Sequence, residues 1–196
     1  MSVVVVVRKG DRAVMAADTQ TSDGSIVLSA EYITNHEKIV TFGDSYFGFA
    51  GWSASQEIMQ SVMRNHPDKL DFSTREAVFE TARSIHGLLK KEYFLETQED
   101  EKDQPVESSQ LSMLVAGPRG IFELESYRAV SEYKRFWAIG SGRRFAIGAM
   151  YAVYDQLADP LAIARVGIEA ACQFDDGCSL PMTHHEASLA SSLTTD

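Results

Sequence analysis

The first apolar stretch of the chain runs without interruption from Val3 to Val7. A strand exposed on one face alternates apolar and polar side chains, so a run without alternation predicts a strand that is buried on both faces. The polar segment Arg8 to Asp11 predicts a turn, and Arg12 to Ala17 predicts a returning strand. The two strands form a hairpin that brings Asp18 back toward the start of the chain.

Several shorter apolar segments follow, and Gly, Asp or Asn residues separate them. Segments of this length between turn residues are typical of β-strands. Pro118 to Gly120 indicates a hairpin turn between two of them. The predicted strands cover Ile26 to Leu28, Glu37 to Phe42, Tyr46 to Ala50, Leu111 to Ala116, Ile121 to Glu125 and Phe136 to Ile139.

Two segments between these strands have the periodicity of amphipathic helices. The first begins at a capping box, Ser53 to Gln56, and ends at Asn65 to Pro67. The second begins at another capping box, Ser73 to Glu76. Its apolar positions recur at helical spacing and predict one buried stripe, made of Val78, Phe79, Ala82, Ile85, Leu88 and Leu89.

Two more helices are predicted in the second half of the chain. Gly140 to Gly142 leads into a helix that extends to about Leu157, and Asp159-Pro160 starts another that ends near Phe174. The elements therefore follow the order strands, two helices, strands, two helices. This order predicts two sheets packed on each other, with a pair of helices outside each sheet.

The segment from Glu96 to Gln110 differs in composition from the rest of the chain. It is acidic and polar and contains Pro105, which predicts an exposed or mobile loop. No internal repeat or linker divides the sequence. The 196 residues therefore suit one domain, 1–196, with a sizeable core and this acidic loop at about 96–110.

The chain carries a formal net charge of −10, from 18 basic and 28 acidic residues. Binding of phosphate groups requires a basic surface, so this balance argues against nucleic-acid and anionic-membrane partners. The valine run is too short to span a membrane, and no charged segment precedes it as in a signal peptide. We therefore expect a cytoplasmic protein without nucleic-acid or membrane partners.

Two cysteines, Cys172 and Cys178, are followed by His184 and His185. This pattern lacks the disulfide framework of secreted proteins and the paired Cys-x-x-Cys spacing of structural zinc sites. We therefore expect buried structural thiols, and neither a metal site nor a cofactor.

The most distinctive chemistry lies at the start of the chain. Removal of Met1 leaves Ser2 with a hydroxyl and a free α-amine on one residue, and Ser2 is small enough for methionine aminopeptidase to remove Met1. A serine hydroxyl is a weak nucleophile that needs a base. An α-amine has a pKa of ~8 and can serve as that base. The alternative is a first strand whose serine has no chemical role.

Five segments taken together resemble the proteasome β-subunit family, and most closely its bacterial HslV-type peptidase branch. They occur in the family's order and extend over nearly the whole chain. One such match would be weak evidence, whereas five in order are specific. The segments are Ser2 to Asp18, the region of Lys38, Phe49 to Gly51, Ala138 to Gly142 and Asp176 to Ser179.

The resemblance implies an α+β fold, a four-layer αββα sandwich of two mainly antiparallel sheets, and an N-terminal nucleophile hydrolase. Ser2 takes the position of the family's nucleophile, which is usually threonine. Asp18 takes the position of its buried aspartate, Lys38 that of its lysine, and the N–H of Gly51 that of the oxyanion donor. The supporting positions fall on Ser141, Asp176 and Ser179.

These residue types suit the implied chemistry. Lys38 beside the hydroxyl would favour the alkoxide and lower the pKa of the amine by like-charge repulsion. Asp18 would hold Lys38 in place, and Gly51 leaves its N–H open to a developing oxyanion. Serine lacks the methyl group that restricts χ1 of threonine, so we expect a less preorganised nucleophile. Each residue alone also has a structural explanation, such as a helix N-cap for Ser141.

The leading hypothesis is a proteasome-like peptidase that cleaves peptide or unfolded-protein substrates inside a homo-oligomeric ring. The resemblance also allows an ATP-dependent unfoldase as partner. One alternative is a catalytically silent assembly subunit, although such subunits of the family carry an extension before the first strand and this sequence has none. A second alternative is an amidase for small molecules, which would use the same N-terminal chemistry.

Overall fold

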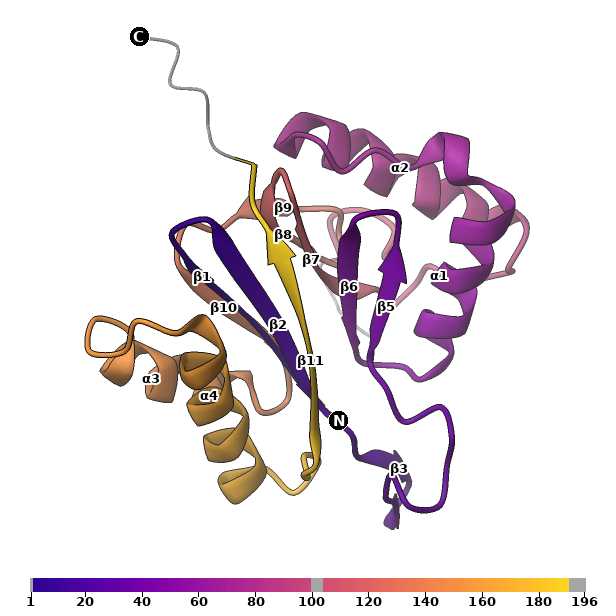
Figure 1. The fold of residues 1–196 in the computed structure, drawn as a ribbon. Coiled ribbons are helices and arrows are strands. Elements are labelled where there is room, and N and C mark those ends of the chain that lie inside the picture. Colours follow the sequence, from indigo (N-terminus) through magenta and orange to yellow (C-terminus); the bar gives the residue numbers. More distant parts are fainter. Residues whose placement is uncertain (1, 100–103, 191–196) are drawn as a thin grey trace, which may run out of the picture.

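The computed structural model describes residues 2–99 and 104–190. It has four layers, with a pair of helices on each outer side and two β-sheets between them (Figure 1). Within each sheet, neighbouring strands are antiparallel. The predicted α+β fold, an αββα sandwich, is therefore confirmed.

The first sheet has the strand order β10, β1, β2, β11. The hairpin predicted at the chain start forms its centre, although both strands are longer than predicted, so that only residues 10–11 remain as the turn. β11 was not predicted from the sequence. The strands are β1 (Val3–Lys9), β2 (Arg12–Asp18), β10 (Phe136–Gly140) and β11 (Met182–Ser188).

The valine run is buried on both faces of β1, as its lack of alternation predicts. Val3, Val5 and Val7 belong to the core between the first sheet and its helices, which are α3 (Arg143–Val153) and α4 (Pro160–Phe174). Val4 and Val6 belong to the core between the two sheets. β1 therefore lies in the middle of the fold, and this fixes the position of the residue that precedes it.

The second sheet has the order β5, β6, β7, β8, β9. Two helices, α1 (Ala54–Asn65) and α2 (Arg75–Lys91), cover its outer face through a core that includes Phe47, Met59 and Ile85. A short 3-10 helix, Pro67–Lys69, joins these helices. The strands are β5 (Ile39–Phe42), β6 (Ser45–Ala50), β7 (Ser112–Gly117), β8 (Gly120–Leu124) and β9 (Val130–Glu132).

The helix starts differ from the predicted capping boxes. Ser53 makes no side-chain capping hydrogen bond at α1, and α2 is capped by Thr74, whose hydroxyl accepts from the N–H of Ala77 at 3.1 Å. The predicted stripe of α2 is buried except for Phe79, which is 47% exposed. α4 begins as predicted, while α3 ends at Val153, before the predicted limit.

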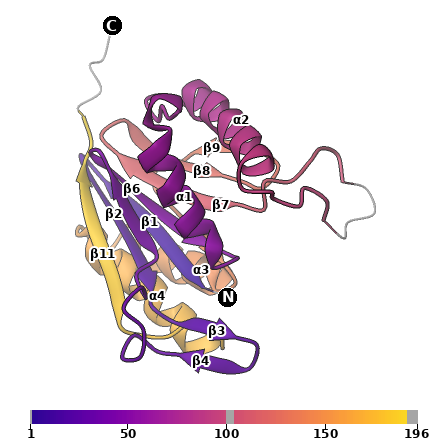
Figure 2. The ribbon, with the colours of Figure 1, turned by 90° about the vertical axis from the view of Figure 1, so that its right-hand side faces the viewer.

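A small hairpin of β3 (Thr21–Asp23) and β4 (Ile26–Leu28) extends from the two sheets. Figure 2 shows it close to the chain start and to the first turn of α1. It was predicted only in part, since β3 is polar and has no strand pattern in the sequence. This hairpin forms one wall of the cavity described below.

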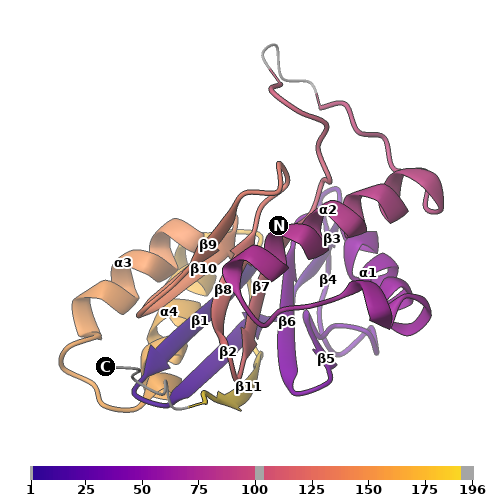
Figure 3. The ribbon, with the colours of Figure 1, turned by 90° about the horizontal axis from the view of Figure 1, so that it is seen from above.

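The acidic loop projects beyond α2 (Figure 3), but it is not simply exposed as predicted. Ser108 is fully buried, and Thr97 is 7% exposed. Glu107 binds His86 and Lys90 of α2, and these contacts fasten the loop to the helix. The prediction for 100–103 falls outside the described residues. None of the described helices is long and apolar enough to cross a membrane.

Candidate active site

Ser2 directly precedes β1 and is buried, with 6% of its surface exposed. Its main-chain nitrogen donates a hydrogen bond to Ser141 Oγ at 3.1 Å. Its carbonyl oxygen accepts one from the N–H of Gly142 at 3.3 Å. Gly140 permits this close approach, because a Cβ there would lie 2.1 Å from the same oxygen. The segment that leads into α3 therefore holds the start of the chain in place.

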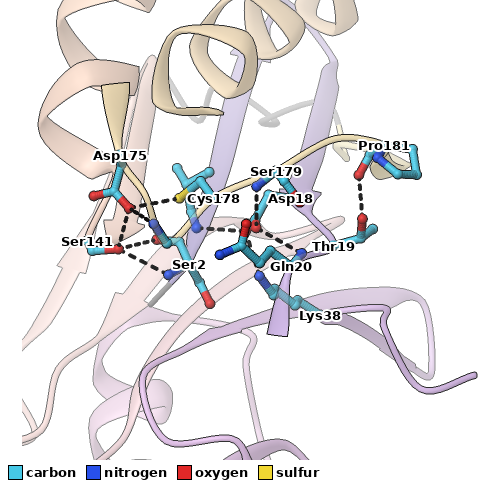
Figure 4. Close-up of polar contacts among 12 residues, drawn as sticks. Ser2, Asp18, Thr19, Gln20, Lys38, Ser141, Asp175, Cys178, Ser179 and Pro181 are labelled. Atoms are coloured by element: carbon cyan, nitrogen blue, oxygen red, sulfur yellow. Dashed lines mark hydrogen bonds and ion pairs between the residues drawn. The ribbon is translucent and has the colours of Figure 1, made fainter. Parts of the chain in front are cut away.

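Asp18 is fully buried at the end of β2 and connects three segments of the chain (Figure 4). Its Oδ1 accepts hydrogen bonds from Lys38 Nζ at 2.6 Å and from the N–H of Val3 at 2.9 Å. Its Oδ2 accepts from the N–H of Gln20 at 3.1 Å and that of Ser179 at 3.3 Å. These partners compensate the cost of burying the carboxylate.

The aspartate that contacts Ser141 is Asp175, whereas the family resemblance implied Asp176 as the supporting aspartate. Ser141 Oγ donates to Asp175 Oδ1 at 3.1 Å. The side chain of Asp176 is exposed, and its carbonyl oxygen instead accepts from the side-chain amide of Gln20 at 2.9 Å. A chain of hydrogen bonds thus extends from the Ser2 nitrogen through Ser141 to Asp175 (Figure 4).

Gly51 follows β6 and has a φ of +114°, a backbone conformation that favours glycine. A Cβ at this position would meet no atom of residues 2–99 and 104–190 within 4 Å, so Gly51 borders open space there. Together with Ser2 and Lys38 it lines a cavity of about 450 Å³. The predicted oxyanion donor therefore borders the same cavity as the predicted nucleophile.

The structure brings six of the seven predicted site residues to two connected places. Ser2, Lys38 and Gly51 line the cavity, Asp18 holds Lys38, and Ser141 contacts the Ser2 nitrogen. The backbone of Ser179 binds Asp18, and its hydroxyl makes no hydrogen bond within the described residues. Asp176 reaches this network only indirectly, because its carbonyl oxygen binds Gln20 while its side chain is exposed, and it is Asp175 that contacts Ser141.

The two cysteines lie near this network but have no reactive character. Burial raises the pKa of the Cys172 thiol to about 11. Burial, with the nearby charge of Asp18, also raises the pKa of Cys178 far above its usual range. Both thiols are therefore protonated at neutral pH. His185 binds Glu37 at 2.6 Å, and the described residues contain no cluster suited to hold a metal ion.

The sequence analysis did not identify two residues of this network, Asp175, which contacts Ser141, and Gln20, which contacts Asp18. The main-chain contact of Gln20 with Asp18 spans two residues, which is the pattern of an Asx turn and gives a usable sequence signal. No comparable signal separates Asp175 from Asp176. Which of the two faces Ser141 depends on how the loop after α4 lies against the start of α3.

No family model matches the chain. Two curated relatives extend over most of it. "ATP-dependent protease subunit HslV" of Bartonella quintana is 28% identical over 178 residues, which cover 87% of this chain and 80% of the relative. "Proteasome subunit beta" of Nanoarchaeum equitans is 24% identical over 188 residues, which cover 89% of this chain and 87% of the relative.

Solved structures are more similar still. Thiobacillus denitrificans BPH is 36% identical and superposes with a TM-score of 0.89, over 96% of this chain and 98% of its own. Its complex with epoxomicin is 37% identical with a TM-score of 0.87, over 96% of this chain and 100% of its own. Eukaryotic HslV from Trypanosoma brucei, at 22% identity and a TM-score of 0.68 over 95% of this chain and 99% of its own, shows the same fold.

Proposed function

This chain belongs to the proteasome β-subunit family, in its HslV-type branch, and on that basis we propose that it is a peptidase with Ser2 as nucleophile after removal of Met1. One observation carries the proposal. The buried Ser2 lies at a cavity that it shares with Lys38, whose ammonium group is bound to the buried Asp18. A serine at the chain start, a lysine and an open cavity are what an N-terminal nucleophile requires.

In the first step, Ser2 Oγ attacks the carbonyl carbon of the scissile peptide bond and its proton passes to the α-amine of Ser2. The ammonium group of Lys38 favours the alkoxide by its charge. Asp18 keeps this ammonium group in position through the contact at 2.6 Å. Because Asp18 also binds the N–H of Val3, the lysine and the start of β1 are held by one carboxylate.

The Ser2 nitrogen acts as the base, and Ser141 orients it through the hydrogen bond at 3.1 Å. Asp175 Oδ1 accepts a hydrogen bond from the Ser141 hydroxyl, so the hydroxyl oxygen keeps a lone pair toward the Ser2 nitrogen. Asp175 is therefore a positioning residue that acts through Ser141. The protonated amine later gives its proton to the leaving amine of the substrate when the C–N bond breaks.

The tetrahedral intermediate carries a negative charge on the former carbonyl oxygen. The N–H of Gly51 donates to this oxygen, since Gly51 borders the cavity and carries no side chain in its way. Collapse of the intermediate leaves an ester on Ser2 Oγ. A water molecule, activated by the same amine, hydrolyses the ester and restores the serine.

Several copies of the chain further assemble into a homo-oligomeric ring. This ring cleaves peptide or unfolded-protein substrates in the cytoplasm. Large apolar side chains that are exposed in one chain suit burial between subunits, as for Tyr32 (82%), Tyr151 (75%) and Phe174 (69%). The Bartonella relative is named a subunit of an ATP-dependent protease, which supports an ATP-dependent unfoldase as partner. Light scattering should give a molar mass several times that of one chain, and a monomer would contradict the ring.

The catalytic proposal is tested by intact mass, inhibitor labelling and turnover. We expect the purified chain to lack Met1 and to gain the mass of one molecule of epoxomicin, the ligand in the Thiobacillus complex. Ser2→Ala should lower the hydrolysis of fluorogenic peptides by about 10³-fold or more and abolish labelling. Ser131→Ala, on β9, serves as the control and should keep both.

Each failure points to a different alternative. A chain that retains Met1, or that loses it and neither labels nor cleaves, would support the silent assembly subunit. Labelling at Ser2 with hydrolysis of small amides but not of peptides would support the amidase. Unchanged peptide hydrolysis by Ser2→Ala would refute the mechanism itself.

A further inference from the structure

The cavity beside Ser2 has an unbalanced charge. Two carboxylates, Glu37 and Glu57, line it, and Lys38 is the one lysine or arginine among the described residues that do so. Because Lys38 is bound to the buried Asp18 at 2.6 Å, its charge is already compensated. The cavity as a whole is therefore negative, and an acidic side chain inside it would be repelled.

The two carboxylates differ in their availability to a ligand. Glu37 Oε1 lies 2.6 Å from His185 Nε2, so it already has a partner. Glu57 is exposed in the first turn of α1 and makes neither a hydrogen bond nor an ion pair within the part of the chain that the structure describes. Glu57 is thus the cavity carboxylate that is open to a cation.

The cavity also offers apolar surface next to this carboxylate. Leu28 of the β3–β4 hairpin, Ile33 and Phe49 line it together with Glu57. The long side chains of lysine and arginine bury their methylene groups against apolar surface while their charged ends reach a polar partner. Apolar walls and one free carboxylate fit this combination, and the volume of about 450 Å³ leaves room for either side chain.

We propose that this cavity selects lysine or arginine at the substrate residue whose carbonyl is attacked, and that Glu57 is the selecting residue. The proposal rests on the proposed peptidase function, because it places the side chain of that residue beside Ser2. The side chain next to the attacked carbonyl lies nearest to the nucleophile, and the cavity that contains Ser2 is the one that receives it.

Turnover of three N-acetyl-tripeptide coumarylamides, which end in Arg, Leu or Glu, tests the preference. We expect kcat/KM for the Arg substrate to exceed the other two by about tenfold. Glu57→Gln should lower kcat/KM for the Arg substrate by about tenfold and change kcat/KM for the Leu substrate by less than about twofold. Glu57→Lys should reverse the order, with the Glu substrate above the Arg substrate.

A matched control removes the same charge elsewhere. Glu169→Gln, on an exposed position of α4, should leave the three rates in their original order. Labelling by epoxomicin and the melting temperature of each variant show whether the site and the fold are intact. A variant that is labelled normally but loses selectivity still has a reactive Ser2. It has lost only the contact between residue 57 and the substrate side chain.

Binding to Ser2→Ala provides a readout that does not require catalysis. Calorimetry with acetylated tripeptides that end in Arg, Leu or Glu should give about tenfold tighter binding for Arg, and the double variant with Glu57→Gln should lose this difference. Equal binding of the three peptides, or a preference that survives Glu57→Gln, would overturn the inference. A wild-type chain that binds with this preference but cleaves nothing would refute the peptidase function alone.

Discussion

At the residue scale, two adjacent carboxylates behave differently. Asp175 Oδ1 accepts a hydrogen bond from Ser141 Oγ at 3.1 Å, while the side chain of Asp176 is exposed. The proposed mechanism needs Ser141 to orient the amine of Ser2, so of these two carboxylates only that of Asp175 should matter for catalysis. The family resemblance implied Asp176 as the supporting aspartate, whereas in the structure Asp175 contacts Ser141.

We therefore expect Asp175→Asn to lower kcat by at least about tenfold, because a neutral amide is a weaker acceptor for the Ser141 hydroxyl. Asp176→Asn is the matched control and should stay within about twofold of the wild type. Steady-state hydrolysis of a fluorogenic peptide measures both. A larger loss for Asp176→Asn than for Asp175→Asn would restore the original assignment.

At the scale of elements, the start of α2 shows how local rules and structure can differ by one position. The sequence Ser73 to Glu76 satisfies the capping-box pattern with Ser73 as N-cap, yet Thr74 supplies the capping oxygen. Ser73 instead binds Asp71, donating its N–H to Asp71 Oδ1 at 2.9 Å. The preceding turn therefore sets the register of the helix start.

This difference gives a paired prediction for stability. Thr74→Ala should lower the free energy of unfolding by about 1 kcal/mol, because the N–H of Ala77 loses its partner. Ser73→Ala should change it by less than about 0.5 kcal/mol, since its hydroxyl does not cap the helix. Urea unfolding at one fixed protein concentration measures both. The reverse order would mean that the predicted capping box forms after all.

The strands show which elements a sequence pattern can reveal. The central strand β1 was predicted because burial on both faces leaves a run of valines. The edge strand β11 was missed because its sequence, Met182 to Ser188, is mostly polar and has no alternation. It is a strand because β2 offers it a ladder of hydrogen-bonding partners. Pairing of this kind is a tertiary effect.

At the scale of the whole molecule, the carboxylate of Glu123 is buried in the contact between the two sheets. Glu123 of β8 is 9% exposed and lies opposite Leu114, which belongs to the core between the sheets. The hydroxyl of Tyr133 donates to Glu123 Oε2. Burial nevertheless raises the pKa of Glu123 above its usual value of 4.5.

A carboxyl group with a raised pKa in the folded state binds protons more tightly there than in the unfolded chain. Its contribution to stability is therefore complete below pH 4.5 and is lost as the pH rises through the raised pKa of the folded state. Glu123→Gln removes this loss and keeps an oxygen that accepts from Tyr133. The stability of the variant relative to the wild type should thus increase from pH 4.5 toward neutral pH.

Urea unfolding of both proteins between pH 4.5 and 8, at one protein concentration, measures this difference. Glu132→Gln, at an exposed position of the neighbouring strand β9, is the control and should follow the wild type at every pH. A difference between Glu123→Gln and the wild type that does not change with pH would contradict the effect of burial on this carboxyl.

The sequence by itself determined the local elements and, through its resemblance to a family, the order of layers and most of the residues proposed for the site. Periodicity and turn residues act over a few neighbours, so they predict strands and helices well. Tertiary structure decided the contacts between distant segments. Ser2 and Ser141 are 139 residues apart, and the choice of Asp175, the strand β11 and the cavity that Glu57 lines all arise where such segments pack together. These features depend on interactions between residues that are far apart in the sequence. A local sequence pattern does not show which distant residues will meet.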